Sequence, residues 1–409
     1  MPQKAKLTPI PSGTVTSPKG FFAGAVHAGI KYQGEERLDL GVLYSEAPCA
    51  VAGMFTTSRV KSAPVVITRQ RVAGGTARAL VANSGCANAC TGEQGLADAR
   101  EMARLISAPL GVPEENVLVA STGVVGVPMP MERIEEGLER IALARDGGHE
   151  FARAIMTTDT FPKEVAVAVS GGGLEYTVAG VAKGAGMIHP DMATMLCFLT
   201  TDARVEPGFL RRALKRAVDL SLNMVTVDGD TSPSDTVLLL ASGLAPTPVG
   251  EIAGGSTAGR TFQRALDHVC TELARCIARD GEGATRLIEV TVEGARTVRE
   301  ARLAARTIAG SSLVKSAVYG ADPNWGRVVA ALGRSGVALE ESRLDVCLGD
   351  VCVMRDGWPQ RFDLERAREA LRQKEVGIGV DLNLGRGRGV AWGCDLTPEY
   401  VTINSAYTT

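Results

Sequence analysis

Histidine is scarce in this sequence, and the usual metal-binding patterns are missing. The 409 residues include four histidines, and none of them forms an HExxH motif. Cys86 and Cys90 offer two possible ligands, but no matching second pair follows them. Because a structural zinc site needs a full set of ligands at regular spacing, we expect no metal and no cofactor.

Long apolar runs and blocks of like charge are also missing. No stretch approaches the ~18 consecutive apolar residues of a membrane helix. The chain has 44 Lys plus Arg against 46 Asp plus Glu, a formal net charge of −2. It lacks the run of about five or six like charges that marks a nucleic-acid-binding arm. We therefore expect neither a membrane nor a nucleic acid as a partner.

The beginning of the sequence does not favour secretion. Prolines at positions 2, 9, 11 and 18 interrupt the segment in which a signal peptide needs unbroken apolar residues. The nine cysteines are an odd number scattered along the chain, which favours reduced thiols. We expect a cytoplasmic protein.

Glycine is abundant, and the residue patterns predict an α/β protein. The chain has 47 glycines, more than the usual ~7% of residues, which indicates many tight turns. Short valine-rich runs predict strands at 40–46, 51–57, 63–69, 78–84, 117–122, 164–170 and 174–182. Apolar residues at helical spacing predict helices at 95–106, 131–143, 208–222 and 261–277.

The pattern changes after Gly283. Residues 287–294 alternate as in a strand, and residues 299–308 have helical spacing. Two alternating runs meet at Gly349 and Asp350, as in a β-hairpin, and residues 379–392 around GRGRG also have the pattern of a hairpin turn. We expect a larger domain at 1–283 and a smaller C-terminal α/β domain at 284–409.

One polar, glycine-rich segment, residues 181–199, contains a candidate nucleophile. Polar residues through Asp191 give way at Thr194 to the apolar run MLCFL, so Thr194 stands where a loop enters a buried strand. The simplest interpretation is a β-branched residue that favours strands. The alternative is chemical: a hydroxyl that attacked the Ala193 carbonyl would move the acyl group from nitrogen to oxygen. Hydrolysis of that ester would free an amino-terminal threonine.

A freed amino terminus would give Thr194 its own base. An α-amine has a pKa of about 7.7–8.0, so it accepts a proton near neutral pH. It can therefore activate the hydroxyl of the same residue. One residue would supply nucleophile and base, which suits a chain with so few histidines.

Several segments together resemble the ornithine acetyltransferase family, also called the glutamate N-acetyltransferase family. KGAGMIHPDMATML at 183–196 resembles the self-cleavage site of that family. The other matching blocks follow in family order: NSGCANACTG at 83–92, STGVVG at 121–126, TTDT at 157–160, MVTVDGDTSPSDT at 224–236, GADPNWGR at 320–327 and the ending NSAYTT. The resemblance covers essentially the whole chain.

The resemblance implies a fold, a reaction and a set of site residues. The fold is a four-layer α-β-β-α sandwich followed by a smaller C-terminal α/β domain. The reaction moves an acetyl group from N-acetylornithine to glutamate in arginine biosynthesis, by a ping-pong route through acetyl-Thr194. Cleavage between Ala193 and Thr194 comes first, and the two chains stay together and pair again as a heterotetramer. Family oxyanion residues fall on Thr122 and Gly123, and family substrate-binding residues fall on Thr160, Lys183, Thr194, Glu282, Asn404 and Thr409.

These positions also have physical roles. The Gly123 amide and the Thr122 hydroxyl can donate to a developing oxyanion. Lys183 and Glu282 supply a cation and an anion for a substrate that carries a carboxylate and an ammonium group. The alternative interpretation is ordinary: turn residues and solvated surface charges.

Three aspartates near residue 230 admit two interpretations. Asp228, Asp230 and Asp235 resemble a carboxylate cluster for a divalent metal, but their spacing is not that of an EF-hand. We favour hydrogen-bonded turns.

Rival functions remain open at this point. The arginines of GRGRG could cradle a phosphate in a nucleotide-binding module, although the GK[ST] ending of phosphate loops is missing. A self-processing aminopeptidase or amidohydrolase with an amino-terminal threonine would pass the acyl group to water instead. Some members of the resembled family also use acetyl-CoA, and Arg386 and Arg388 are candidates for its phosphates. We expect N-acetylornithine as the main donor.

Overall fold

Nine strands in the larger part of the computed structural model form one hydrogen-bonded network. The structure describes residues 5–31, 34, 37–189, 195–245 and 250–406. The strand order is β1-β6-β7-β8-β9-β3-β4-β5, with β2 paired to β3. The strands are β1 (Lys6–Pro9), β2 (Phe21–Val26), β3 (Leu40–Phe55), β4 (Thr76–Asn83), β5 (Val117–Ser121), β6 (Lys163–Gly171), β7 (Leu174–Lys183), β8 (Leu196–Thr201) and β9 (Thr236–Ala241).

Strand β3 connects two stacked layers of this network. Its first half pairs with β2 and β4, whereas Ala50–Phe55 pairs with β9, and the register shifts between Tyr44 and Cys49. The two strands expected at 40–46 and 51–57 are therefore one strand that passes from one layer into the other. An apolar cluster that includes Leu43 and Phe198 fills the space between the layers.

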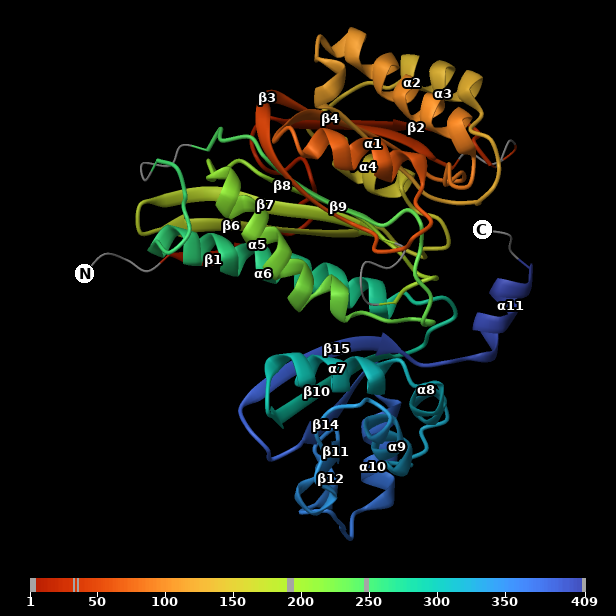
Figure 1. Cartoon of the computed structure of the whole chain (residues 1–409), viewed down its shortest axis with the longest axis vertical. Helices are drawn as coiled ribbons and strands as arrows, with labels where there is room; N and C mark the ends of the chain where they lie inside the picture. The colour runs from red at the N-terminus through yellow and green to blue at the C-terminus, as the bar shows by residue number, and fades with distance from the viewer. Residues whose placement is uncertain (1–4, 32–33, 35–36, 190–194, 246–249, 407–409) are drawn as a thin grey trace.

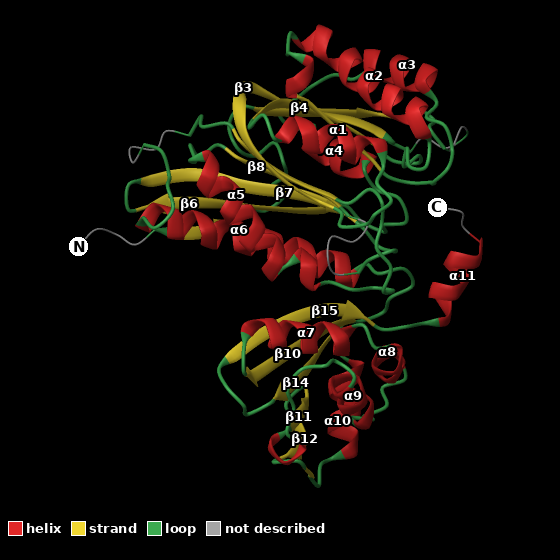
Figure 2. Ribbon diagram, in the orientation of Figure 1, coloured by secondary structure: helices red, strands yellow, loops and turns green. Residues whose placement is uncertain are grey.

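Helices cover both outer faces of the two layers (Figures 1 and 2). Helix α6 (Thr257–Arg279) packs on β6 and β7, and α5 (Pro207–Leu220) packs on β3 and α6. Helix α2 (Gly92–Leu110) packs on β4 and β5, and α3 (Met131–Glu139) packs on β3 and α2. Helix α4 (Gly148–Ala154) places Phe151 against Phe198 of β8. The expected α-β-β-α sandwich is confirmed.

The strand expected at 63–69 is wrong, because the segment is helix α1 (Ala63–Val72). Pro64 suits the first helical turn, where its missing N–H is not needed. A short apolar run does not separate a buried helix from a strand. Thr68 adds a tertiary reason, since its hydroxyl donates to the Val119 carbonyl at 2.6 Å and accepts from the Val119 amide at 2.8 Å. The helix thereby supplies hydrogen-bond partners for backbone groups on the outer edge of β5.

The C-terminal part forms a second sheet with order β13-β12-β11-β14-β10-β15. A single apolar cluster runs from α6 into this part, so the division at residue 283 stays a prediction. The strands are β10 (Leu287–Ala295), β11 (Asp345–Leu348), β12 (Val351–Arg355), β13 (Trp358–Pro359), β14 (Glu375–Asp381) and β15 (Gly387–Cys394), and the helices are α7 (Val298–Ala309), α8 (Ser312–Tyr319), α9 (Gly326–Gly333), α10 (Leu364–Arg372) and α11 (Pro398–Ala406).

The hairpin expected at Gly349 and Asp350 is confirmed, because β11 and β12 pair antiparallel across it. The hairpin expected at 379–392 is wrong. Strands β14 and β15 both pair with β10 and lie on either side of it. The chain between Asp381 and Gly387 therefore crosses the end of β10, and the last three residues of GRGRG belong to β15.

Close packing explains the glycines of GRGRG. A Cβ atom on Gly387 would lie 2.3 Å from the Thr297 carbonyl oxygen, and one on Gly389 would lie 2.6 Å from the Arg302 amide nitrogen. The glycines therefore let the start of α7 approach β15. The Arg388 Nε atom donates to Glu293 at 2.7 Å. These contacts remove the reason for assigning a phosphate cradle here.

Helix α11 leaves the second sheet and lies beside the loop that follows α6 (Figure 1). The Thr397 hydroxyl donates to the Gly283 carbonyl at 2.7 Å, which fixes where this helix starts. Within the described residues, no helix is long and apolar enough to cross a membrane.

Candidate active site

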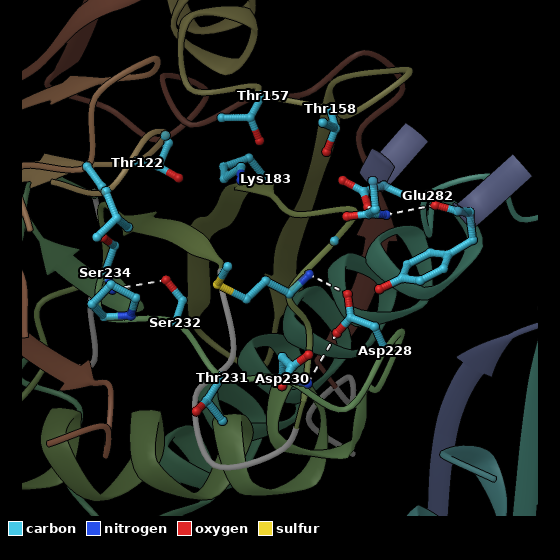
Figure 3. Close-up of a pocket in the computed structure, with 18 residues that line it drawn as sticks. Thr122, Thr157, Thr158, Lys183, Asp228, Asp230, Thr231, Ser232, Ser234 and Glu282 are labelled. Atoms are coloured by element: carbon cyan, nitrogen blue, oxygen red, sulfur yellow. Dashed lines mark hydrogen bonds between the residues drawn. The ribbon is translucent and has the colours of Figure 1, made fainter. Parts of the chain in front are cut away.

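A cavity of about 290 Å³ opens where the loops after β5, β7 and α6 meet helix α11. Figure 3 shows Thr122 and Glu282 at opposite sides of this cavity, with Lys183 between them. Its lining includes Thr122, Gly123, Thr157, Thr158, Lys183, Met187, Asp228, Asp230, Ser232, Ser234, Glu282, Tyr400 and Asn404.

Thr122 and Gly123 follow the end of β5 and form one wall. Thr122 is 2% exposed, and its amide donates to the Asn83 carbonyl at 3.0 Å. Gly123 has φ of 128°, and a Cβ atom there would lie 2.4 Å from the Gly85 carbonyl carbon. The position therefore needs glycine. The two residues expected as oxyanion donors thus lie side by side on the cavity wall.

Lys183 ends β7 and is 2% exposed. Burial lowers the pKa of its ammonium group, and the charge of Asp159 partly offsets this. Within the described part of the chain, no carboxylate lies within ion-pair distance of its Nζ atom. Lys183 is therefore a buried lysine that lines the cavity without a carboxylate at ion-pair distance among those residues.

Glu282 lies across the cavity from Thr122, in the loop after α6. It is 7% exposed, and its Oε2 atom accepts from the Asn404 side-chain amide at 2.7 Å. Tyr400, one turn earlier on α11, also lines the cavity. Burial, together with Asp228 and Glu282, raises the pKa of the Tyr400 hydroxyl, so it stays neutral. Sequence reasoning missed Tyr400, which stands outside the recognised ending NSAYTT.

Asp228 shapes the loop that follows β7. It accepts from the Met187 amide at 2.5 Å and the Ile188 amide at 2.9 Å, as the interpretation of a hydrogen-bonded turn predicts. Met187 has φ of 54°, a left-handed conformation that costs energy for a residue with a side chain. Among the described residues, no group of three or more His, Cys, Asp or Glu side chains could hold a metal ion.

Thr160 does not line the cavity. Its amide donates to Asp280 Oδ2 at 3.0 Å, and its hydroxyl donates to Asp280 Oδ1. Asp280 also accepts from Lys163, which pairs with Asp159 as well. Sequence reasoning missed these three charged residues. The available signal was a lysine directly before the alternating apolar segment 164–170, at the first position of β6.

Ala193, Thr194 and Thr409 lie outside the described residues. The residue after Thr194, Met195, is 1% exposed, and its amide donates to Asp235 Oδ1 at 3.1 Å. Burial raises the pKa of Asp235 well above its ordinary value. Its Oδ2 atom is buried and has no hydrogen-bond partner among the described residues. Asp235 therefore holds the start of β8 with one carboxyl oxygen and keeps the other buried beside it.

The arrangement separates opposite charges across one small space. Lys183 presents a basic group, and Glu282, Asp228 and Asp230 present acidic groups from the other side. Amide and hydroxyl donors at Gly123 and Thr122 complete the wall. Such a cavity suits a small amino-acid derivative with a carboxylate, an ammonium group and a polar carbonyl.

The sequence is similar to a known protein family. The sequence model of the ArgJ family matches residues 22–409. The arginine biosynthesis bifunctional protein ArgJ of Dehalococcoides mccartyi is 52% identical over 406 residues, which cover 99% of this chain and 100% of that protein. The protein of the same name from Symbiobacterium thermophilum is 54% identical over 400 residues, covering 97% of this chain and 99% of that protein.

A solved structure is also similar. The crystal structure of the arginine biosynthesis bifunctional protein ArgJ from Bacillus halodurans has 44% sequence identity and a TM-score of 0.50, over 51% of this chain and 98% of that chain. With the match to the family model over residues 22–409, these relatives establish that the chain belongs to the ArgJ family.

Proposed function

We propose that this protein is a glutamate N-acetyltransferase of arginine biosynthesis. It moves an acetyl group from N-acetylornithine to glutamate through Thr194, after cutting itself between Ala193 and Thr194. Family membership supports the reaction. The observation that carries the assignment is the cavity in which Lys183 and Glu282 face the donors Thr122 and Gly123.

Self-cleavage prepares the nucleophile. The Thr194 hydroxyl attacks the Ala193 carbonyl, the C–N bond breaks, and the amine takes the proton. Water then hydrolyses the ester, which leaves a carboxylate on Ala193 and a free amine on Thr194. Met195 supports a fixed cleavage site, because its amide holds the residue after the cut against Asp235.

Acetyl transfer then takes two matched steps. The Thr194 amine accepts the hydroxyl proton as the oxygen attacks the acetyl carbonyl of N-acetylornithine. Thr122 and Gly123 donate to the oxyanion, a contribution of about 2.7–4 kcal/mol for each donor in comparable enzymes. The departing ornithine amine takes the proton and leaves acetyl-Thr194. The glutamate amine attacks that ester and restores the free threonine.

Charged and polar residues would recognise the substrates. Lys183 binds the α-carboxylate that both substrates carry, and Glu282 binds the ammonium group of the ornithine side chain. Asn404 holds Glu282 in place through its side-chain amide. Thr409 and Thr160 complete the set by the family resemblance, Thr160 acting through Asp280.

The assembly is part of the same proposal. The two chains stay associated and pair as a heterotetramer in the cytoplasm, with domains at 1–283 and 284–409. The printed names of the relatives call them bifunctional. This favours acetyl-CoA as a second acetyl donor, used more slowly than N-acetylornithine.

Intact mass spectrometry tests the proposal. Purified protein should consist of two chains, the second beginning TMLCFL, whereas Thr194→Ala should stay whole. N-acetylornithine alone should add one acetyl group to the second chain, and glutamate should remove it. Acetate released at the same rate with and without glutamate would instead identify a hydrolase.

A further inference from the structure

Lys163 is a buried ammonium group at the back of the cavity wall. Its side chain is 0% exposed, and its Nζ atom lies 2.6 Å from Asp159 Oδ1 and 2.6 Å from Asp280 Oδ2. Both carboxylates are also buried. Taking such ions out of water costs several kcal/mol for each, so a buried triad is not explained by stability alone.

Each carboxylate of this triad binds the backbone of a loop. Asp159 accepts from the Gly184 amide at 2.7 Å and from the Thr157 amide at 3.0 Å. The Gly184 amide belongs to the loop that carries Met187, and Thr157 lines the cavity itself. Asp159 thus ties two cavity loops to Lys163.

Asp280 connects the third loop. It accepts from the Thr160 amide at 3.0 Å and stands two residues before Glu282. The Glu282 amide in turn donates to the Ala185 carbonyl at 2.9 Å. Three loops that are distant in sequence therefore converge on a single ammonium group.

We propose that Lys163 is a positioning residue for acetyl transfer: it fixes the loops that carry Thr157, Met187 and Glu282, and with them the backbone that directly follows Lys183. This inference rests on the proposed function, in which Lys183 binds a substrate carboxylate. Lys163 touches neither the cavity nor the reacting atoms, so it acts through its neighbours.

The charged or titratable groups that act electrostatically on Lys183 come from several elements. Asp159 precedes β6, Lys163 begins β6, Glu282 follows α6 and Asp235 precedes β9. Burial lowers the pKa of Lys183, Asp159 raises it, and the like charge of Lys163 lowers it further. Lys183 must be protonated to bind a carboxylate, so substrate use falls as pH rises through its pKa.

The test compares two variants of the processed enzyme that push this pKa in opposite directions. Lys163→Met removes the like charge. It should move the alkaline limb of the pH profile of kcat/KM for N-acetylornithine to higher pH. Asp159→Asn removes the attracting charge and should move that limb to lower pH. Each shift should be on the order of one pH unit.

A matched control separates this effect from a loss of packing. Lys315 is also buried, and its ammonium donates to the Val227 carbonyl, but it is not among the groups that face Lys183. Lys315→Met should leave the limb in place. Limbs that stay unchanged in both Lys163→Met and Asp159→Asn would overturn the inference. If Lys163→Met does not fold, Lys163→Gln replaces it, and an alkaline limb that stays in place in Lys163→Gln would overturn the inference.

A second measurement does not need turnover. NMR of protein labelled with ¹³C at the lysine ε-carbons gives the pKa of Lys183 directly, with Lys183→Met assigning the signal. The same opposite shifts are expected, and equal values in wild type and variants would overturn the inference. A wild type that transfers no acetyl group contradicts the proposed function, whereas unmoved lysine signals contradict only the role of Lys163.

Discussion

The Asn404 side-chain amide donates to Glu282 Oε2 at 2.7 Å, which ties the last helix of the chain to the cavity. Helix α11 has no buried residue of its own. Its position therefore depends on a few polar contacts rather than on an apolar core. Asn404 is the contact that links it directly to a group proposed to bind substrate.

Breaking this contact should weaken substrate use without unfolding the protein. Asn404→Ala leaves Glu282 without its donor, so we expect a higher KM for N-acetylornithine and an unchanged melting temperature. Ser405→Ala is the matched control, because the Ser405 hydroxyl donates only to Thr402 on the exposed side of the same helix in the described structure. Equal KM values for Asn404→Ala and Ser405→Ala would contradict the role of Asn404.

The proposed oxyanion donors predict a loss in kcat. Thr122→Val removes the hydroxyl at nearly constant volume and should lower kcat by about 10²–10³, whereas Thr122→Ser should retain most activity. Val127→Ala, on the exposed part of the same loop, should have little effect. Steady-state kinetics on processed enzyme give the answer, and a Thr122→Val enzyme with wild-type kcat would remove Thr122 from the mechanism.

The buried triad predicts how stability depends on pH. Burial alone would raise the pKa of Asp159, but Lys163 and Lys183 hold it below its ordinary value. Its stabilising contribution is therefore present above the unfolded pKa of about 3.9 and is lost as pH falls below it. Asp159→Asn should lower the free energy of unfolding by about 3–5 kcal/mol near neutral pH, and the difference should shrink toward pH ~3.

Urea unfolding at several pH values measures this difference. Asp350→Asn is the control, because Asp350 and its partner Arg366 are both exposed and such pairs contribute little. A difference between wild type and Asp159→Asn that stays constant with pH would mean that Asp159 is not charged in the folded protein.

The use of acetyl-CoA as a second acetyl donor can be tested separately. Processed enzyme with glutamate and acetyl-CoA should release coenzyme A thiol, more slowly than the turnover with N-acetylornithine. Arg386→Ala should not change this rate, because GRGRG packs on α7 and does not line the cavity. Absence of thiol release would restrict the enzyme to N-acetylornithine.

Local sequence patterns predicted most helices and strands. They missed the features of the fold that depend on contacts between residues distant in sequence. The helices expected at 208–222 and 261–277 form as α5 and α6, because a one-sided apolar pattern needs only a surface to cover. Residues 63–69 became helix α1 because Thr68 satisfies the edge of β5, a contact that lies 51 residues away in sequence. Likewise, the position of β10 between β14 and β15 follows from long-range pairing.

In the candidate site, too, some residues could be predicted from local sequence and others could not. Thr122, Gly123, Lys183, Glu282 and Asn404 stand in recognisable polar segments, and the fold brings them to one cavity. Lys163, Asp159 and Asp280 stand apart in sequence and become a triad only after folding. Residue spacing does not predict an ion pair between Lys163 and Asp280, which are 117 residues apart in sequence.

Strands β8 and β9 lie between β7 and β3, so the segment after residue 194 supplies the central strands of a sheet whose outer strands come from the segment before it. A cut at residue 194 would leave two polypeptides interleaved through backbone ladders on both sides. They could not separate, or exchange with pieces from another molecule, without dismantling the sheet. Two halves synthesised from separate genes would each begin with unpaired edges in the middle of the fold, so we expect them to assemble only when they fold together.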